Sequence, residues 1–133
     1  MAKGFKQHQE RQQSLSLLGK PLARRAASKC ELCETPGRSL TIYEVSPVPA
    51  EPDLDHCLFI CSPCLTQLEK PKQRDPRSLR PLTSTVWSDI PAVQVTAYRL
   101  LKAIAPTTDW ARESLEYLEL EPEIQAWADT PLR

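Results

Sequence analysis

The chain has 133 residues, of which 13 are proline and 6% are aromatic, and its formal net charge at pH 7 is zero. This length fits one domain or one small module with an appendage, and the neutral balance excludes a uniformly charged polyelectrolyte. No stretch approaches the roughly 18 apolar residues of a membrane span, and the N-terminus lacks the apolar segment of a secretory signal. We therefore predict a cytoplasmic protein without membrane association, whose five cysteines serve metal or thiol chemistry rather than disulfides.

Residues 1–29 are basic although the whole chain is neutral. They hold seven basic residues against Glu10 alone, a net charge of +6, and residues 30–133 carry the opposite charge of −6. Residues 1–13 are polar and predict a basic disordered tail, whereas residues 14–29 predict an N-terminal helix that a glycine and a proline interrupt. The basic segment either contacts nucleic acid or an acidic protein partner, or it stays solvated.

A hairpin is predicted in the middle of the chain. Residues 39–45 alternate as a strand does, residues 46–55 hold three prolines and predict a loop, and residues 56–60 predict the returning strand. A serine and a proline then favour the start of a short helix over residues 62–70. One pair of cysteines precedes the first strand and another follows the second strand.

These two cysteine pairs are the strongest functional signal in the sequence. Each has two residues between its cysteines, 27 residues separate the pairs, and the members are Cys30, Cys33, Cys61 and Cys64. Each turn of this type presents two thiolates on one side, and the hairpin brings the two turns together. Four thiolates at about 2.3 Å fill the shell of a tetrahedral zinc ion and leave no position for water. The pattern therefore predicts one structural Zn²⁺ in a zinc-ribbon module of residues 30–69, and the energy of zinc binding is then folding energy.

Other chemistries are open to the same cysteines. Iron fits the same four-sulfur geometry. A redox pair of the thioredoxin type follows a strand and begins a helix, as Cys61 and Cys64 do, but this would leave the first pair unexplained. Cys57 is either a small buried strand residue or an alternate ligand, and His56 could ligate although four cysteines already complete the shell. His8, in the N-terminal tail, has no partner.

The order of cysteine pair, hairpin, cysteine pair and helix is also that of the treble-clef HNH nucleases. Those enzymes place histidines near the end of the first strand, one of them as a general base. Here Tyr43 and Glu44 stand at that place, and no histidine follows the helix. A hydrolytic metal site needs open coordination and a base, so the sequence argues against a nuclease.

The C-terminal part is predicted to be helical. Residues 70–81 predict a basic linker broken by prolines, and residues 82–133 predict a helical segment. Within this segment, residues 88–106 have the strongest helical period in the chain, and further helices are expected over residues 107–120 and 121–129. An added helical layer would supply the core that a small zinc ribbon lacks.

Two features of this part have both a structural and a functional interpretation. The basic side chains of residues 70–80 either contact phosphate or stay solvated: Lys70, Lys72, Arg74, Arg77 and Arg80. Trp87, Ile90 and Pro91 either pack within the helical layer or form a partner groove, which an exposed aromatic patch would support.

Several segments together resemble the PhnA family, small zinc-ribbon proteins named after an alkylphosphonate-utilisation operon. They span about residues 28–129: SKCELCE, LTIYEVSPVP, DHCLFICSPCLTQLE, LTSTVWSDIPAVQVTAYRLL and LEPEIQAWAD. The long VWSDIPAVQV segment carries no general motif, which makes the resemblance specific. The resemblance implies a cytoplasmic bacterial protein with an N-terminal zinc ribbon, and by motif it assigns metal ligation to the same four cysteines. Longer members continue past the AWA segment into a small SH3-like β-barrel, whereas this chain stops at Arg133.

Some members of that family carry the label phosphonoacetate hydrolase. This sequence shows no cluster of Asp and His for two catalytic zinc ions and no glycine-rich phosphate loop, with three glycines in all. We therefore expect an α+β protein, a zinc-ribbon or treble-clef-like hairpin module with a helical layer, that binds a protein or nucleic acid rather than acting as an enzyme. An accessory factor or hydrolase of alkylphosphonate metabolism is the alternative, and a thiol- or metal-handling protein in which Cys57 matters is a third hypothesis.

Overall fold

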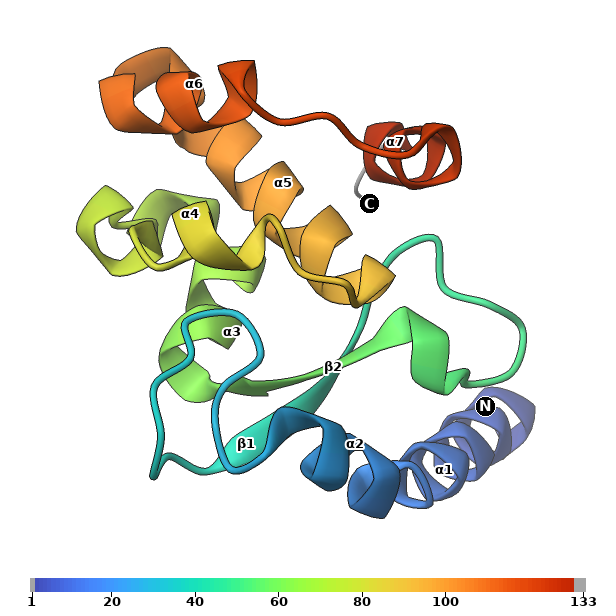
Figure 1. Ribbon diagram of the computed structural model, residues 1–133. Helices are drawn as coiled ribbons and strands as arrows, with labels where there is room; N and C mark the ends of the chain where they lie inside the picture. The colour runs from blue at the N-terminus through green and yellow to red at the C-terminus, as the bar shows by residue number, and fades with distance from the viewer. Residues whose placement is uncertain (1, 131–133) are drawn as a thin grey trace.

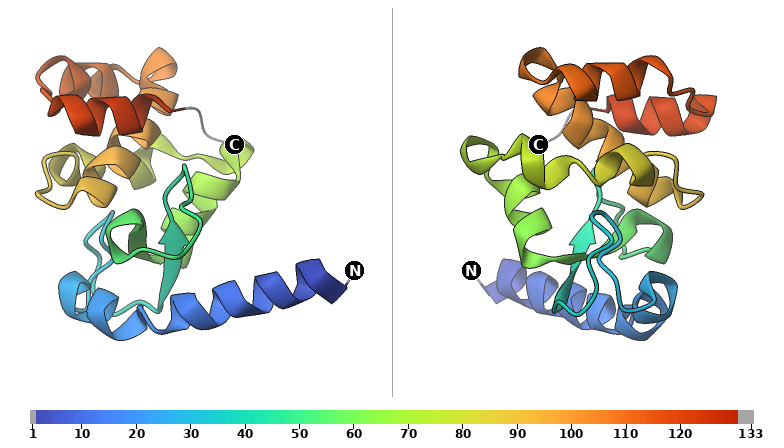
Figure 2. Two further views of the ribbon diagram at one scale, coloured as in Figure 1. Left: turned by 90° about the vertical axis from the view of Figure 1, so that its right-hand side faces the viewer. Right: turned by 60° about the vertical axis from the view of Figure 1, so that its left-hand side comes forward.

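The computed structural model describes residues 2–130, and the side chains of residues 8–130. Figure 1 shows a two-stranded hairpin with helices α1 and α2 on one side and helices α4 to α7 on the other. The two views of Figure 2 show the same separation of the N-terminal helices from the C-terminal helices. The mixture of helices with one antiparallel hairpin confirms that part of the predicted architecture.

The hairpin consists of β1 (Leu40–Glu44) and β2 (Cys57–Cys61). Leu40 lies opposite Cys61 and Glu44 lies opposite Cys57, so the register brings the end of β2 back to the start of β1. Four of the five β2 residues are fully buried, because helices cover the strand on both faces, and this explains its continuous apolar run. Helix α3 (Ser62–Glu69) follows β2 without a loop and begins with a proline in its first turn, as predicted.

The helical layer is built around α5 (Pro91–Ile104), which contacts α4 (Leu82–Thr85), α6 (Asp109–Glu116) and α7 (Pro122–Asp129). Helix α5 also reaches β2, so that the layer and the hairpin share one core. The predicted helical segments are present but shorter than expected. Prolines at the first turns of α5 and α7 mark their starts, since proline has no N–H to donate there.

The N-terminal segment differs from the prediction. Residues 1–13 were expected to be a disordered tail, but helix α1 spans Ala2–Ser16. A separate helix, α2, spans Gly19–Ala26, so the helix predicted over residues 14–29 is interrupted as expected, but the break falls at Leu17 and Leu18 and Pro21 lies inside α2. Met1 lies outside the described residues, as do the side chains of Lys3 and Lys6.

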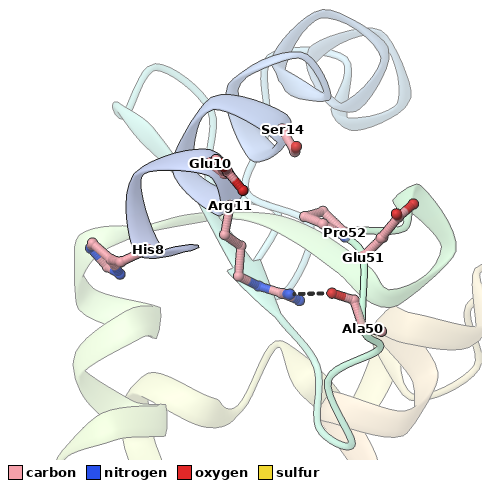
Figure 3. A pocket seen from close by; sticks show the side chains of 7 residues that line it. All are labelled: His8, Glu10, Arg11, Ser14, Ala50, Glu51 and Pro52. Carbon is pink, nitrogen blue, oxygen red and sulfur yellow. Dashed lines mark hydrogen bonds between the residues drawn. The ribbon is translucent and has the colours of Figure 1, made fainter. Parts of the chain in front are cut away.

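Arg11 explains how α1 is held against the hairpin. Its guanidinium pairs with both carboxylate oxygens of Glu44, at 2.5 and 2.9 Å, and donates to the carbonyls of Pro49 and Ala50, each at 2.9 Å. Figure 3 shows this side chain reaching from α1 across a hollow to the loop that follows β1. Paired bidentate geometry of this kind is the strongest form of ion pair. The composition of residues 1–13 could not reveal it, because Glu44 lies 33 residues away.

The connection over residues 70–81 is mostly exposed, as a solvated linker would be, but it forms ordered turns and is anchored to the core at one residue. It forms two short 3₁₀ turns, Pro71–Gln73 and Pro76–Leu79, and Leu79 is fully buried in the core. The Gln67 side chain, which is itself buried, accepts a hydrogen bond from the backbone of Asp75 at 2.8 Å. Prolines here shape turns instead of separating two independent units.

Arg99 is a buried cation that joins α5 to α7 and to the loop after β1. It donates to the carbonyls of Ser46, Trp127, Ala128 and Thr130 and to the Ser46 hydroxyl, at 2.7 to 3.2 Å. Burial lowers its pKa, and no carboxylate among the described residues pairs with it. The five acceptors compensate the cost of burying this charge, and they include carbonyls at the C-terminal end of α7.

We expect Arg99→Met to lower the free energy of unfolding by about 3 kcal/mol, since it leaves buried carbonyls without a partner. The measurement is urea unfolding of the purified protein, followed by circular dichroism. Arg112→Met is the matched control, because Arg112 is an exposed arginine on α6 that also donates to carbonyls. The control should cost less than about 1 kcal/mol. Equal losses of stability in the two variants would show that the hydrogen bonds of Arg99 do not stabilise the packing of α5 against α7.

Candidate metal centre

The four cysteines predicted as ligands come from two places in the fold. Cys30 and Cys33 lie in the turn after α2, whereas Cys61 ends β2 and Cys64 lies in the first turn of α3. Their sulfur atoms all lie within 4.8 Å of one another. Within residues 8–130, they are the one group of three or more Cys, His, Asp or Glu side chains that meets at a single point.

The sulfur positions fit a tetrahedral metal ion. Cys30 Sγ lies 3.7 Å from Cys64 Sγ, and Cys33 Sγ lies 3.7 Å from Cys61 Sγ. Zinc bonds of about 2.3 Å in a regular tetrahedron require sulfurs about 3.8 Å apart. Three of the four cysteines are buried and Cys33 is half-buried, so the centre is closed on most sides. The donor set and its spacing therefore fit one ion held entirely by the protein.

The backbone around Cys30 and Cys33 forms a tight turn that presents the two sulfurs. The N–H of Cys30 donates to the carbonyl of Thr35 at 3.1 Å, and the N–H of Glu34 donates to the carbonyl of Cys30 at 2.9 Å. Glu34 has a φ of 63°, in the left-handed region that costs non-glycine residues about 1 kcal/mol. Such strain persists where surrounding structure holds it in place, and here the turn also holds the two cysteines.

Polar groups surround the sulfurs. The N–H of Cys61 donates to Cys30 Sγ at 3.4 Å, and the Cys33 thiol donates to the Thr35 hydroxyl at 3.1 Å. Arg38 places its guanidinium 3.6 Å from Cys61 Sγ. Four thiolates around a divalent ion leave two negative charges in excess, and these groups offset that charge while orienting the sulfurs.

The pKa values of the thiols diverge from one another. The hydrogen bond between Cys30 and Cys64 lowers the pKa of Cys30 to about 4 and raises the pKa of Cys64. Burial raises the pKa of Cys33. A bound cation would favour the thiolate form of all four, so metal binding must release protons and weaken as the pH falls.

An ion pair and a hydrogen bond that the sequence does not reveal also join the cysteine turn to the hairpin. The Glu31 carboxylate accepts from Arg25 at 2.7 and 2.8 Å and from the N–H of Phe59 at 2.8 Å. Arg25 also donates to the carbonyls of Leu54 and Cys57. The one available signal was an acidic residue between two predicted ligands, and neither its partner Arg25 on α2 nor the N–H of Phe59 could be inferred from spacing.

Cys57 and His56 lie outside the cluster. Cys57 is fully buried in β2, opposite Glu44, as the hypothesis of a small strand residue required. Burial, followed by the nearby Glu44 carboxylate, raises the pKa of Cys57 to about 11. His56 stacks on Trp127 with ring centroids 4.6 Å apart, and its Nδ1 lies 3.5 Å from an Asp53 oxygen. Neither residue belongs to the group that could share an ion.

The structure divides the predicted basic segments into engaged and exposed residues. Arg11 and Arg25 are held in ion pairs. Arg74 donates to the carbonyls of Gln67 and Leu68 at the end of α3, and Arg80 lies 4.8 Å from the ring centre of Trp110. The exposed lysine and arginine side chains among the described residues of the two segments are Lys20, Arg24, Lys29, Lys70, Lys72, Arg77 and also Arg80.

No protein-family model, curated protein or solved structure matches the chain. None of the helices in the described part is both long enough and apolar enough for a membrane crossing.

We expect Cys57→Ser to retain one metal ion per chain and Cys61→Ser to lose it, as measured by elemental analysis of the purified proteins.

The pKa of Cys57 is raised above its ordinary value of 9.0, so its contribution to stability is complete below pH 9 and is lost as the pH rises toward 11. Unfolding of the wild type should therefore show an alkaline decline between pH 9 and 11 that is smaller in Cys57→Ser. Loss of metal from Cys57→Ser would show that the ligand set is wrong.

Proposed function

We propose that the protein binds one Zn²⁺ through Cys30, Cys33, Cys61 and Cys64 and that this zinc is structural. The observation behind the proposal is the pair of 3.7 Å sulfur contacts, which fit the edges of a zinc tetrahedron. Zinc is preferred to iron because closed four-cysteine sites that join a hairpin to a turn are typical of structural zinc modules. The metal would supply cross-linking, with the four thiolates filling its shell.

The position of the centre supports a folding role. Zinc at this point would tie the turn after α2 to the end of β2 and the start of α3, which are 28 to 34 residues apart along the chain. Strands β1 and β2 have five residues each, and such a hairpin has little stability alone. Binding energy at the centre would therefore stabilise the whole module of residues 30–69.

We further propose that the protein acts by binding another macromolecule rather than by chemistry at the metal. The sulfur shell is complete and mostly buried, so the centre offers a substrate no open coordination position. The absence of disulfides among the five cysteines suits a reducing compartment, which supports the cytoplasm as the location. The resemblance to the PhnA family, with its bacterial origin and zinc ribbon, fits this proposal, and the link to alkylphosphonate use rests on that resemblance alone.

Elemental analysis and native mass spectrometry of the purified protein should find one zinc per chain. Chelation should remove this zinc together with the circular dichroism signal of the folded module, and added Zn²⁺ should restore both, because binding and folding are coupled. Cys64→Ser should behave as the chelated wild type does. Absorption in the visible range would reveal iron instead.

The proposal is contradicted if the protein keeps its fold after complete removal of the metal. That result would favour a redox or sensing role for the four cysteines.

A further inference from the structure

A groove of about 560 Å³ lies where the connection between α4 and α5 meets the start of α7. Trp87, Pro91, Pro122 and Ile124 form its apolar part. Trp87 is 53% exposed, which is unusual for the largest apolar side chain of a small protein. This tryptophan does not belong to the metal centre.

The rest of the groove is strongly acidic. Asp89, Glu119, Glu121 and Glu123 line it, all four are exposed, and no lysine, arginine or histidine lies among its described lining residues. None of the four forms an ion pair with another described residue. The N-termini of α5 and α7 contribute only about half a positive charge each, which leaves a clear negative excess.

The walls of the groove are held in place. The Gln94 side chain donates to the carbonyl of Val86 at 2.9 Å, and the Ser88 hydroxyl accepts from the N–H of Ile90 at 3.1 Å. Gln125 of α7 donates to the hydroxyl of Tyr98 on α5 at 3.3 Å. A groove with fixed walls loses little conformational entropy when it is filled.

We propose that this groove binds a basic segment of a partner protein, with an arginine or lysine side chain on the face of Trp87 and neighbouring cations paired to the four carboxylates. The inference deepens the proposed binding function and rests on it. Cation–π contact and complementary charge both favour such a ligand, and the same charge repels nucleic acid. No three of these four carboxylates lie close enough together to share one metal ion. Their spacing suits separate cationic side chains better.

A second copy of this chain is a less suitable occupant. Its exposed lysine and arginine side chains, among the described residues, lie outside the groove: Lys20, Arg24 and Lys29 in α2 and the turn after it, Arg38 before β1, Lys70, Lys72, Arg77 and Arg80 in the connection after α3, Lys102 on α5 and Arg112 on α6. Figure 1 shows α2 on the other side of the hairpin from α7. Contact between these different faces would be head-to-tail, which builds rings or open chains rather than closed pairs.

The test uses the full-length, zinc-loaded protein and fluorescence anisotropy of a labelled eight-residue peptide of alternating arginine and alanine. The double variant Glu121→Gln with Glu123→Gln should weaken binding about fivefold or more. Its control is Glu113→Gln with Glu116→Gln, which removes the same charge from exposed residues of α6 outside the groove and should weaken binding less than about twofold. Trp87→Ala should also weaken binding about fivefold, and Trp87→Phe should recover part of the loss.

Several outcomes would overturn the proposal. Equal losses from the two double variants would show that only net charge matters. If a labelled single-stranded RNA bound as tightly as the peptide or more tightly, the ligand would be nucleic acid rather than a basic protein segment. Self-association in sedimentation velocity that the groove variants abolish would identify a second copy as the occupant.

Zinc content and circular dichroism, measured on the same samples, separate this inference from the proposed structural zinc. A folded, zinc-loaded protein that fails to bind the peptide overturns the groove alone. A folded protein without zinc that binds the peptide through Trp87 contradicts the structural metal and supports the groove.

Discussion

The convergence of four sulfurs from two distant turns is the constraint on which the rest of the structure depends. The hairpin between the turns has only five paired positions, so it cannot define its own geometry by hydrogen bonding alone. Where the sulfurs meet, the end of β2 and the start of α3 are placed against the turn after α2. Helix α3 and the connection over residues 70–81, which is anchored by Leu79, then lead to α4 and α5, whose buried residues complete the core.

A second constraint is the loop between the strands, which has prolines instead of a ladder of hydrogen bonds. Three arginines from three helices donate to its carbonyls and those of the strand residue that follows: Arg11 of α1, Arg25 of α2 and Arg99 of α5. Buried carbonyls need such partners, and prolines cannot supply donors of their own. The loop therefore joins both groups of helices to the hairpin, although its sequence predicts only a connection between two strands.

The distribution of charge gives the two sides of the molecule different character. A chain of zero net charge places a basic excess in residues 1–29 and an acidic excess in the remainder. Part of the basic excess is used internally, since Arg11 and Arg25 hold helices to the hairpin. The carboxylates around Trp87 have no such internal partner among the described residues. The surface with unsatisfied charge and an exposed aromatic ring therefore lies on the helical layer, away from the N-terminal helices.

The sequence by itself determined the local elements and the candidate ligands. The spacing of the cysteines, the alternation over residues 39–45 and the helical period after residue 88 depend only on neighbouring residues, and the structure has elements at each of these places. Helix boundaries were less accurate, because the ends of α5 and α6 depend on packing as well as on propensity. Only the tertiary structure decided that residues 2–16 form a helix, that Leu79 anchors the exposed connection over residues 70–81 to the core, and that Cys57 lies apart from the cluster. These outcomes depend on partners up to 33 residues away, such as Glu44 for Arg11, and sequence patterns of short period carry no information about contacts of that range.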